Sequence, residues 1–125
     1  MRAVFLVGVL WLAAFILPGT NARAAELVML EQPGCPWCAK FNAEIAPIWP
    51  KTEEGKRVPL RRVDITRPWP ADLSDIRKER LTPTFVLVED GREIGRLRGY
   101  PGDEFFWSSI DELIAELPHK AAATE

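Results

Sequence analysis

The sequence predicts an α/β protein, a three-layer sandwich built around a four-stranded mixed sheet. Three observations lead to this fold class: a strand-helix-strand unit, a later β-hairpin, and an amphipathic helix that follows the hairpin. The full predicted order is strand-helix-strand-helix-strand-strand-helix, and its first crossover is expected to be right-handed. A chain of 125 residues suits one domain, and 47% hydrophobic with 27% charged residues is typical of a globular fold.

An apolar segment opens the chain. Arg2 precedes fourteen apolar residues, 4–17, which are too few to span a bilayer comfortably but suit the hydrophobic region of a secretory signal. The triplet Ala22-Arg23-Ala24 has the small-x-small form that signal peptidases recognise. We therefore expect a signal peptide over residues 1–24, cleavage after Ala24, and a folded domain over residues 25–118. An uncleaved membrane anchor is the alternative.

Charge and metal-ligand content exclude several function classes. Lys plus Arg is 16 and Asp plus Glu is 18, with no long run of one sign, so nucleic-acid binding is not expected. With the signal cleaved, membrane insertion of the mature chain is not expected either. Two cysteines and one histidine, His119, cannot fill a four-ligand zinc site alone, and we expect no cofactor. Residues 119–125 have nothing to bury and are expected to form a disordered tail.

The first half of the domain gives two strands and a helix. Leu27–Glu31 is a short apolar run, predicted to be a strand buried on both faces. A helix is predicted from Pro36 to about Trp49, although Pro47 should kink it or end it early. The alternating residues of Val58–Ile65 predict a second strand.

The second half gives a helix, a hairpin and a last helix. Leu73 and Ile76 have helical spacing and predict a short helix over 72–80. Two apolar runs, 85–88 and 94–97, flank Asp90-Gly91, a strong hairpin signal. An amphipathic helix is predicted from about Asp103 to Leu117.

The chemistry lies in Cys35-Pro36-Trp37-Cys38, where the first strand gives way to the first helix. Residues three apart on a helical turn lie close enough for a disulfide. Cys35 would sit at the helix N-terminus, where free N–H groups favour its thiolate, and Cys38 would be shielded one turn inside. We therefore expect Cys35 to attack a partner's disulfide and Cys38 to resolve the mixed disulfide. A static structural disulfide and half of a metal site remain alternatives.

This pair, together with Leu81-Thr82-Pro83-Thr84 before the third strand, resembles the thioredoxin superfamily over residues 27–117. The resemblance implies that Pro83 is cis and faces the disulfide, an ordinary trans proline being the alternative. The backbone of Thr82 would then pair with an incoming substrate segment. Gly99 and Tyr100 would form the other wall of the groove by the same analogy, unless they serve only as a turn.

A family position is altered here. Thioredoxins carry a buried acid six residues before the first cysteine, where this chain has Met29. Glu31 shares the face of Met29 two residues further along the strand, so it is a candidate general base for the inner thiol, or else a solvated strand-end glutamate. Trp37 and Trp69 are further candidates for substrate contact, with surface exposure and core packing as their respective alternatives.

The segment from Gln32 to Cys38 is similar to the glutaredoxin active-site run. The chain without its expected signal peptide is more similar to small periplasmic thioredoxins of bacterial thiosulfate-oxidising (Sox) systems. That resemblance rests on the Pro-Trp dipeptide, on residues 99–102 and on Phe105-Phe106-Trp107. It implies a periplasmic thiol-disulfide oxidoreductase that reduces a partner's cysteine, such as that of a sulfur-oxidation carrier, and takes electrons from a membrane donor. A disulfide-forming oxidant and a copper or other metal chaperone are the alternatives.

Overall fold

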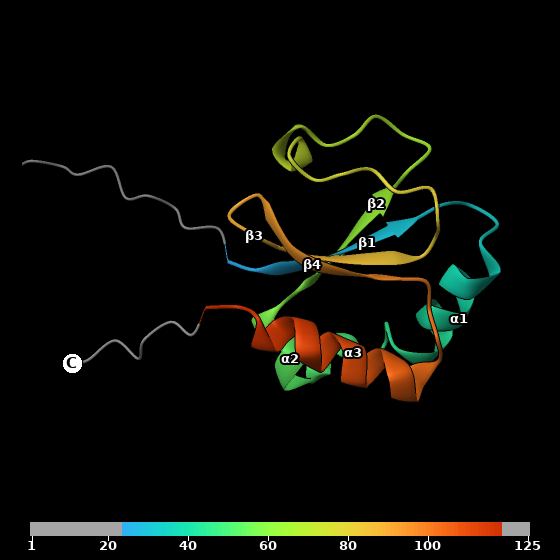
Figure 1. Ribbon diagram of the computed structural model, residues 1–125. Helices are drawn as coiled ribbons and strands as arrows, with labels where there is room; N and C mark the ends of the chain where they lie inside the picture. The colour runs from blue at the N-terminus through green and yellow to red at the C-terminus, as the bar shows by residue number, and fades with distance from the viewer. Residues whose placement is uncertain (1–23, 119–125) are drawn as a thin grey trace, which may run out of the picture.

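The computed structural model describes residues 24–118 (Figure 1). The predicted signal peptide lies outside the described residues except for its last position, Ala24, and so does the predicted tail, 119–125. Within residues 24–118, no helix is both long enough and apolar enough to cross a bilayer.

Four strands form one mixed sheet, as predicted. They are β1 (Glu26–Glu31), β2 (Leu60–Asp64), β3 (Thr84–Glu89) and β4 (Arg92–Arg98), in the order β2-β1-β3-β4. β1 pairs in parallel with β2 and antiparallel with β3, which pairs antiparallel with β4. β1 is central and is buried on both faces, because Leu27 and Met29 join one core and Val28 and Leu30 the other.

Helices cover one face of the sheet (Figure 1). They are α1 (Pro36–Glu44), the short α2 (Glu53–Arg57) and α3 (Asp103–Ala115). Phe41 from α1 and Phe106 from α3 meet over Phe85 of β3, with ring centroids 4.7 to 5.3 Å apart. The aromatic cluster fixes α1, and hence the cysteines at its start, against the centre of the sheet.

α1 ends at Glu44, well before Trp49, in agreement with the expected effect of Pro47. Trp49 instead begins a 3₁₀ turn, η1 (Trp49–Lys51), that packs its indole into the core. The helix α2 was not predicted. The Thr52 hydroxyl accepts the N–H of Gly55 and caps this helix, with acidic residues in its first turn and basic residues in its last.

The prediction of a helix over 72–80 is wrong. Only Ala71–Leu73 is helical, as the 3₁₀ turn η2, and irregular chain continues to Thr82 (Figure 1). Leu73 and Ile76 do bury their side chains against the second face of the sheet, so their spacing reported burial correctly. The layer over this face is therefore an irregular segment and not a helix.

Side chains from elsewhere satisfy the backbone of this segment, which explains why no helix forms. The indole N–H of Trp69 donates to the Leu73 carbonyl at 2.8 Å, and Arg96 of β4 donates to the Arg77 carbonyl at 3.0 Å. The Glu79 carboxylate accepts from the backbone N–H groups of residues 80 and 81, at 3.0 and 3.3 Å. These side chains thus take up backbone groups that a helix would have bonded internally.

The predicted hairpin is confirmed at Asp90-Gly91. Asp90 has φ 52° and Gly91 has φ 74°, the two positive values that a type I′ turn requires. The pairing of β3 with β4 contains one register shift, between Leu87 and Val88. The hairpin leaves β4 as an edge strand of the sheet.

Candidate functional site

The two cysteines form a disulfide at the start of α1, with their Cα atoms 5.2 Å apart. Cys35 is the N-cap residue in extended conformation, and its sulfur accepts the backbone N–H of Cys38 at 3.1 Å. Pro36 occupies the first helical turn, where its missing N–H costs nothing. One free N–H of the helix N-terminus, that of Cys38, therefore points at the sulfur of Cys35.

The two sulfurs differ in their access to solvent. Cys38 is 4% exposed and belongs to the main core, whereas Cys35 is only partly buried. A partner's disulfide would thus meet Cys35 first. The expected roles, Cys35 as the attacking and Cys38 as the resolving cysteine, require this difference in solvent access.

The segment before β3 lies beside the disulfide. Its Thr82–Pro83 peptide bond is cis, the form that the family resemblance implied. Gly99 donates its N–H to the Pro83 carbonyl at 2.7 Å, and Gln32 donates from its side-chain amide to the Thr82 hydroxyl at 2.9 Å. Gly99 has φ +87°, a value that other residues rarely adopt. The residue after β1, Gln32, and the residue after β4, Gly99, thus both hydrogen-bond this segment.

One groove joins the outer cysteine to this segment. Its lining combines the residues around Cys35, namely 32–37, with residues 80–82. Trp37 is 55% exposed, and Lys40 places its ammonium 5.5 Å from the centre of the indole ring. The predicted substrate-contact residues Trp37 and Thr82 therefore lie together with Cys35.

A second groove, of about 500 Å³, lies on the β2 side of the disulfide. Glu31 and Asp64 line it together with Cys38 and Asn42. The Glu31 side chain is 25% exposed and pairs with Arg62 at 2.8 Å. The same guanidinium nitrogen lies 3.6 Å from the sulfur of Met29, the residue at the position of the usual buried acid. A carboxylate paired with arginine therefore lines the same groove as the inner cysteine.

Sequence reasoning missed Asp64, which lines this groove, and Arg62, which pairs with Glu31 there. Parallel pairing places Met29 opposite Arg62 and Glu31 opposite Asp64. The hydroxyl and N–H of Thr66 hydrogen-bond Asp64 and hold the pKa of its carboxyl below the usual range. Because parallel strands end at the same edge of a sheet, the polar end of the second strand was the signal that could have found them.

Trp69 and Tyr100 lie elsewhere. Trp69 packs against the second core, with the Lys78 ammonium 5.9 Å from its ring. Tyr100 is 5% exposed and meets Phe41 edge-on in the main core. Neither side chain lines the two grooves beside the disulfide as residues 24–118 define them. Gly99 and Tyr100 were expected to form the other wall of the groove. Of the two, Gly99 contacts the segment before β3, through its hydrogen bond to the Pro83 carbonyl.

In the described part of the chain, no three His, Cys, Asp or Glu side chains group as metal ligands. The chemistry that the geometry offers is thiol-disulfide exchange at a disulfide with one accessible sulfur, flanked by two grooves.

Comparisons with known proteins agree with this chemistry. The model of a thioredoxin-like domain matches residues 16–114. The crystal structure of the periplasmic thioredoxin SoxS from Paracoccus pantotrophus, in reduced form, is 46% identical, with a TM-score of 0.69 over 74% of this chain and 97% of that one.

More distant solved structures show the fold alone. A thioredoxin from Thermus thermophilus is 20% identical, with a TM-score of 0.58 over 74% of this chain and 75% of that one. Malassezia sympodialis thioredoxin is 21% identical, with a TM-score of 0.54 over 74% of this chain and 77% of that one. A comparison with curated protein sequences gave no match. From its sequence match, its sheet and its disulfide, the chain belongs to the thioredoxin-like family of thiol-disulfide oxidoreductases.

Proposed function

We propose that this protein is an exported dithiol reductant that works in the periplasm on the cysteine of a partner protein. The observation that carries the proposal is the disulfide at the start of α1: Cys38 is buried, whereas Cys35 is accessible and shares a groove with Thr82 of the cis Thr82–Pro83 bond. The signal-like N-terminus and the 46% identity to a periplasmic thioredoxin support the location.

In the proposed reaction, the Cys35 thiolate attacks one sulfur of the partner's disulfide, and the other partner sulfur leaves as a thiolate. The Cys38 thiolate then attacks the Cys35 sulfur, which releases the second partner thiol. Two electrons pass to the partner, and the Cys35–Cys38 disulfide remains. A membrane electron donor returns the pair to its dithiol form. The helix N-terminus and the N–H of Cys38 support the negative charge that develops on Cys35.

Glu31 is the proposed base for the inner thiol. It lines the same groove as Cys38 and stands in for the buried acid that Met29 replaces. Its carboxylate accepts a proton from Cys38 through a water in the groove, which raises the fraction of attacking thiolate. Arg62 acts as a positioning residue, since its ion pair holds the carboxylate at the groove.

Substrate contact is proposed for the groove on the Thr82 side. An extended partner segment pairs with the backbone of Thr82 as a short added strand, while Pro83 keeps that backbone facing the disulfide. The exposed indole of Trp37 packs against the same segment. As the resemblance to Sox-type thioredoxins implies, the partner would be a carrier protein of sulfur oxidation whose cysteine must be kept reduced.

The equilibrium potential of the 35–38 pair against glutathione, with insulin reduction as the activity, tests this function. We expect a potential in the reducing part of the thioredoxin range, below about −200 mV, and catalysed insulin reduction that Cys35→Ser abolishes. A potential near about −120 mV would indicate a disulfide-forming oxidant instead. Stoichiometric copper binding without disulfide exchange would indicate a metal chaperone.

A further inference from the structure

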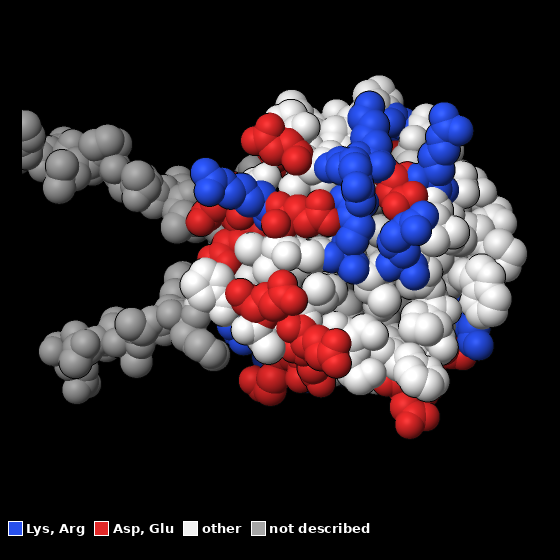
Figure 2. Space-filling model, in the orientation of Figure 1, with Lys and Arg blue, Asp and Glu red and all other residues white. Residues whose placement is uncertain are grey.

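A basic surface lies next to the active-site groove. Figure 2 shows Lys and Arg gathered over β4 and the segment before β3, while acidic side chains gather over the face that carries α3. We define the arginine face by five cations, from the 77–80 segment and from the second half of β4: Arg77, Lys78, Arg80, Arg96 and Arg98. Within residues 24–118, two carboxylates, Glu79 and Glu93, form ion pairs with members of this face. Cations thus outnumber acids here, in a chain of net charge −2.

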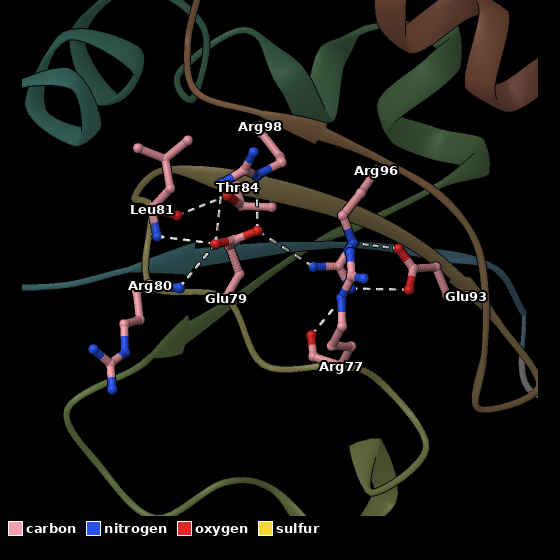
Figure 3. A network of polar contacts seen from close by, with 8 residues as sticks. All are labelled: Arg77, Glu79, Arg80, Leu81, Thr84, Glu93, Arg96 and Arg98. Carbon is pink, nitrogen blue, oxygen red and sulfur yellow. Dashed lines mark hydrogen bonds and ion pairs between the residues drawn. The ribbon is translucent and has the colours of Figure 1, made fainter.

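Both carboxylates are fully engaged by their neighbours (Figure 3). Glu79 accepts from Arg98 at 2.8 Å and from the N–H groups of residues 80 and 81. Glu93 is occupied by two nitrogens of Arg96. The Arg96 side chain is only 8% exposed, and its Nη1 lacks a hydrogen-bond partner. The network therefore holds residues 77–81, just before Thr82, in place. The arginine face keeps a net positive charge, because its cations outnumber the two carboxylates.

Arg80 is the member of the face that reaches the site. Figure 3 shows its side chain pointing away from Glu79 and out of the network. Among residues 24–118, no hydrogen bond or ion pair engages its guanidinium, which is exposed to solvent. Arg80 nevertheless lines the groove that contains Cys35, Trp37 and Thr82. The arginine face is thus continuous with the place where a partner's sulfur must arrive.

We propose that the arginine face docks an acidic segment of the partner protein, adjacent in sequence to the target cysteine. A partner segment that pairs with the backbone of Thr82 as a strand would also pass Arg80. Residues on one face of a strand repeat every second position, so the partner residue near Arg80 would lie about two positions from the partner's target cysteine. Carboxylates there would meet an unpaired guanidinium and the positive field behind it. A protein segment, not a nucleic acid, is the occupant, since it must also deliver a sulfur to Cys35.

The proposal rests on the proposed reductase function, and a pair of peptide disulfides separates the two. Both peptides carry one disulfide; one has three acidic residues starting two positions from the cysteine, and the other has glutamines there. The reduced full-length mature protein is mixed with each, and kcat/KM is compared at low and high salt. We expect the acidic peptide to react roughly tenfold faster at low salt, and the ratio to fall towards one as salt screens the charges.

Two variants locate the effect. Arg80→Gln is expected to reduce the acidic-to-neutral ratio at least about threefold. Arg57→Gln makes the same charge change at an exposed arginine of α2 and is expected to leave the ratio as in the wild type. A wild-type ratio near one overturns the proposal, as does an equal loss in both variants, which would indicate net charge alone. Single-stranded DNA that competes as well as the acidic peptide would overturn the choice of a protein segment.

Reduction of the small neutral hydroxyethyl disulfide by the wild type distinguishes the two failures. If this disulfide is reduced but the peptides react alike, the docking surface is wrong and the reductase stands. If none of the three disulfides is reduced, the proposed function falls and the docking surface falls with it.

Discussion

The hydroxyl of Tyr100 donates a hydrogen bond to the carboxylate of Glu44, with 2.5 Å between the oxygens. Glu44 is the last residue of α1, the helix that starts with the cysteine pair, and Tyr100 precedes α3. Burial and the neighbouring carboxylate raise the pKa of the Tyr100 phenol well above its ordinary value of about 10. The contact thus links the active-site helix to the loop that supports Pro83 through Gly99.

Tyr100 is the only tyrosine in the sequence, so its titration can be followed by ultraviolet absorbance without overlap. At pH 11, a free phenol is about nine-tenths ionised, and we expect Tyr100 in the folded protein to stay protonated. Unfolding then releases a proton, so this contribution to stability is complete below pH 10 and is lost as the pH rises above it. Tyr100→Phe should lose less stability between pH 8 and 11. A phenolate midpoint near 10 in protein that is still folded would contradict the burial of this group.

Cys38→Ser should trap a mixed disulfide between Cys35 and the partner. The outer sulfur still attacks, but no inner thiolate remains to resolve the product, so the complex accumulates. Affinity purification from periplasmic extract and non-reducing electrophoresis measure the yield. Cys35→Ser is the matched control, since Cys38 is 4% exposed and should capture at most about a tenth as much. Equal recovery by both variants would contradict the assignment of Cys35 as the attacking cysteine.

Glu31→Gln should slow the release of the partner from that mixed disulfide about tenfold, because the inner thiol loses its proton acceptor. Arg62→Gln should slow release less, since the carboxylate remains but is no longer held by the ion pair. Single-turnover release, followed across the neutral and mildly acidic range, measures both rates, and circular dichroism checks the fold.

Glu53→Gln provides the control for the loss of a paired carboxylate, because Glu53 pairs with Lys56 on the exposed surface of α2. Its release rate should equal that of the wild type. If Glu31→Gln also releases the partner at the wild-type rate at every pH, Glu31 is a solvated strand-end residue and the inner thiol has another proton acceptor.

Local signals were enough for much of this fold. The uninterrupted apolar run of β1 predicted burial on both faces, and Asp90-Gly91 predicted the hairpin turn that positive φ values confirm. The predicted helix over 72–80 failed because its backbone partners come from distant positions, such as Arg96 on β4. Spacing reports which residues are buried, but not which groups satisfy the backbone between them.

The site divides in the same way. The cysteine spacing predicted the disulfide, and the resemblance to thioredoxins implied the cis bond before Pro83; the structure has both. Arg62 meets Glu31 through strand register, and Arg80 lines its groove in a segment whose backbone bonds to Glu79, and neither is visible in a local pattern. Tyr100 follows the glycine that supports Pro83, yet its ring turns into the core, which adjacency in sequence did not indicate.

The close contact between Gly55 and Trp49 gives a last prediction, about the helical layer under the site. A Cβ atom at Gly55 would lie 1.7 Å from the Trp49 carbonyl oxygen, so backbone must move to admit alanine. Trp49 is 1% exposed and donates its indole N–H to the Val58 carbonyl, so a shift of η1 would also disturb that bond. We expect Gly55→Ala to lower the free energy of unfolding by about 2–3 kcal/mol and the Tm by roughly 10 °C.

Gly95→Ala is the matched control, because the one close contact of the new Cβ would be the end of the Leu113 side chain, 2.6 Å away, which can rotate aside. Its cost should stay within about 1 kcal/mol, partly offset by the lower entropy of the unfolded chain. Urea unfolding of the three proteins measures the difference. Since alanine improves helix propensity by about 1 kcal/mol, a stable Gly55→Ala protein would mean that α2 and η1 can separate freely, and that the Trp49 contact does not hold them together.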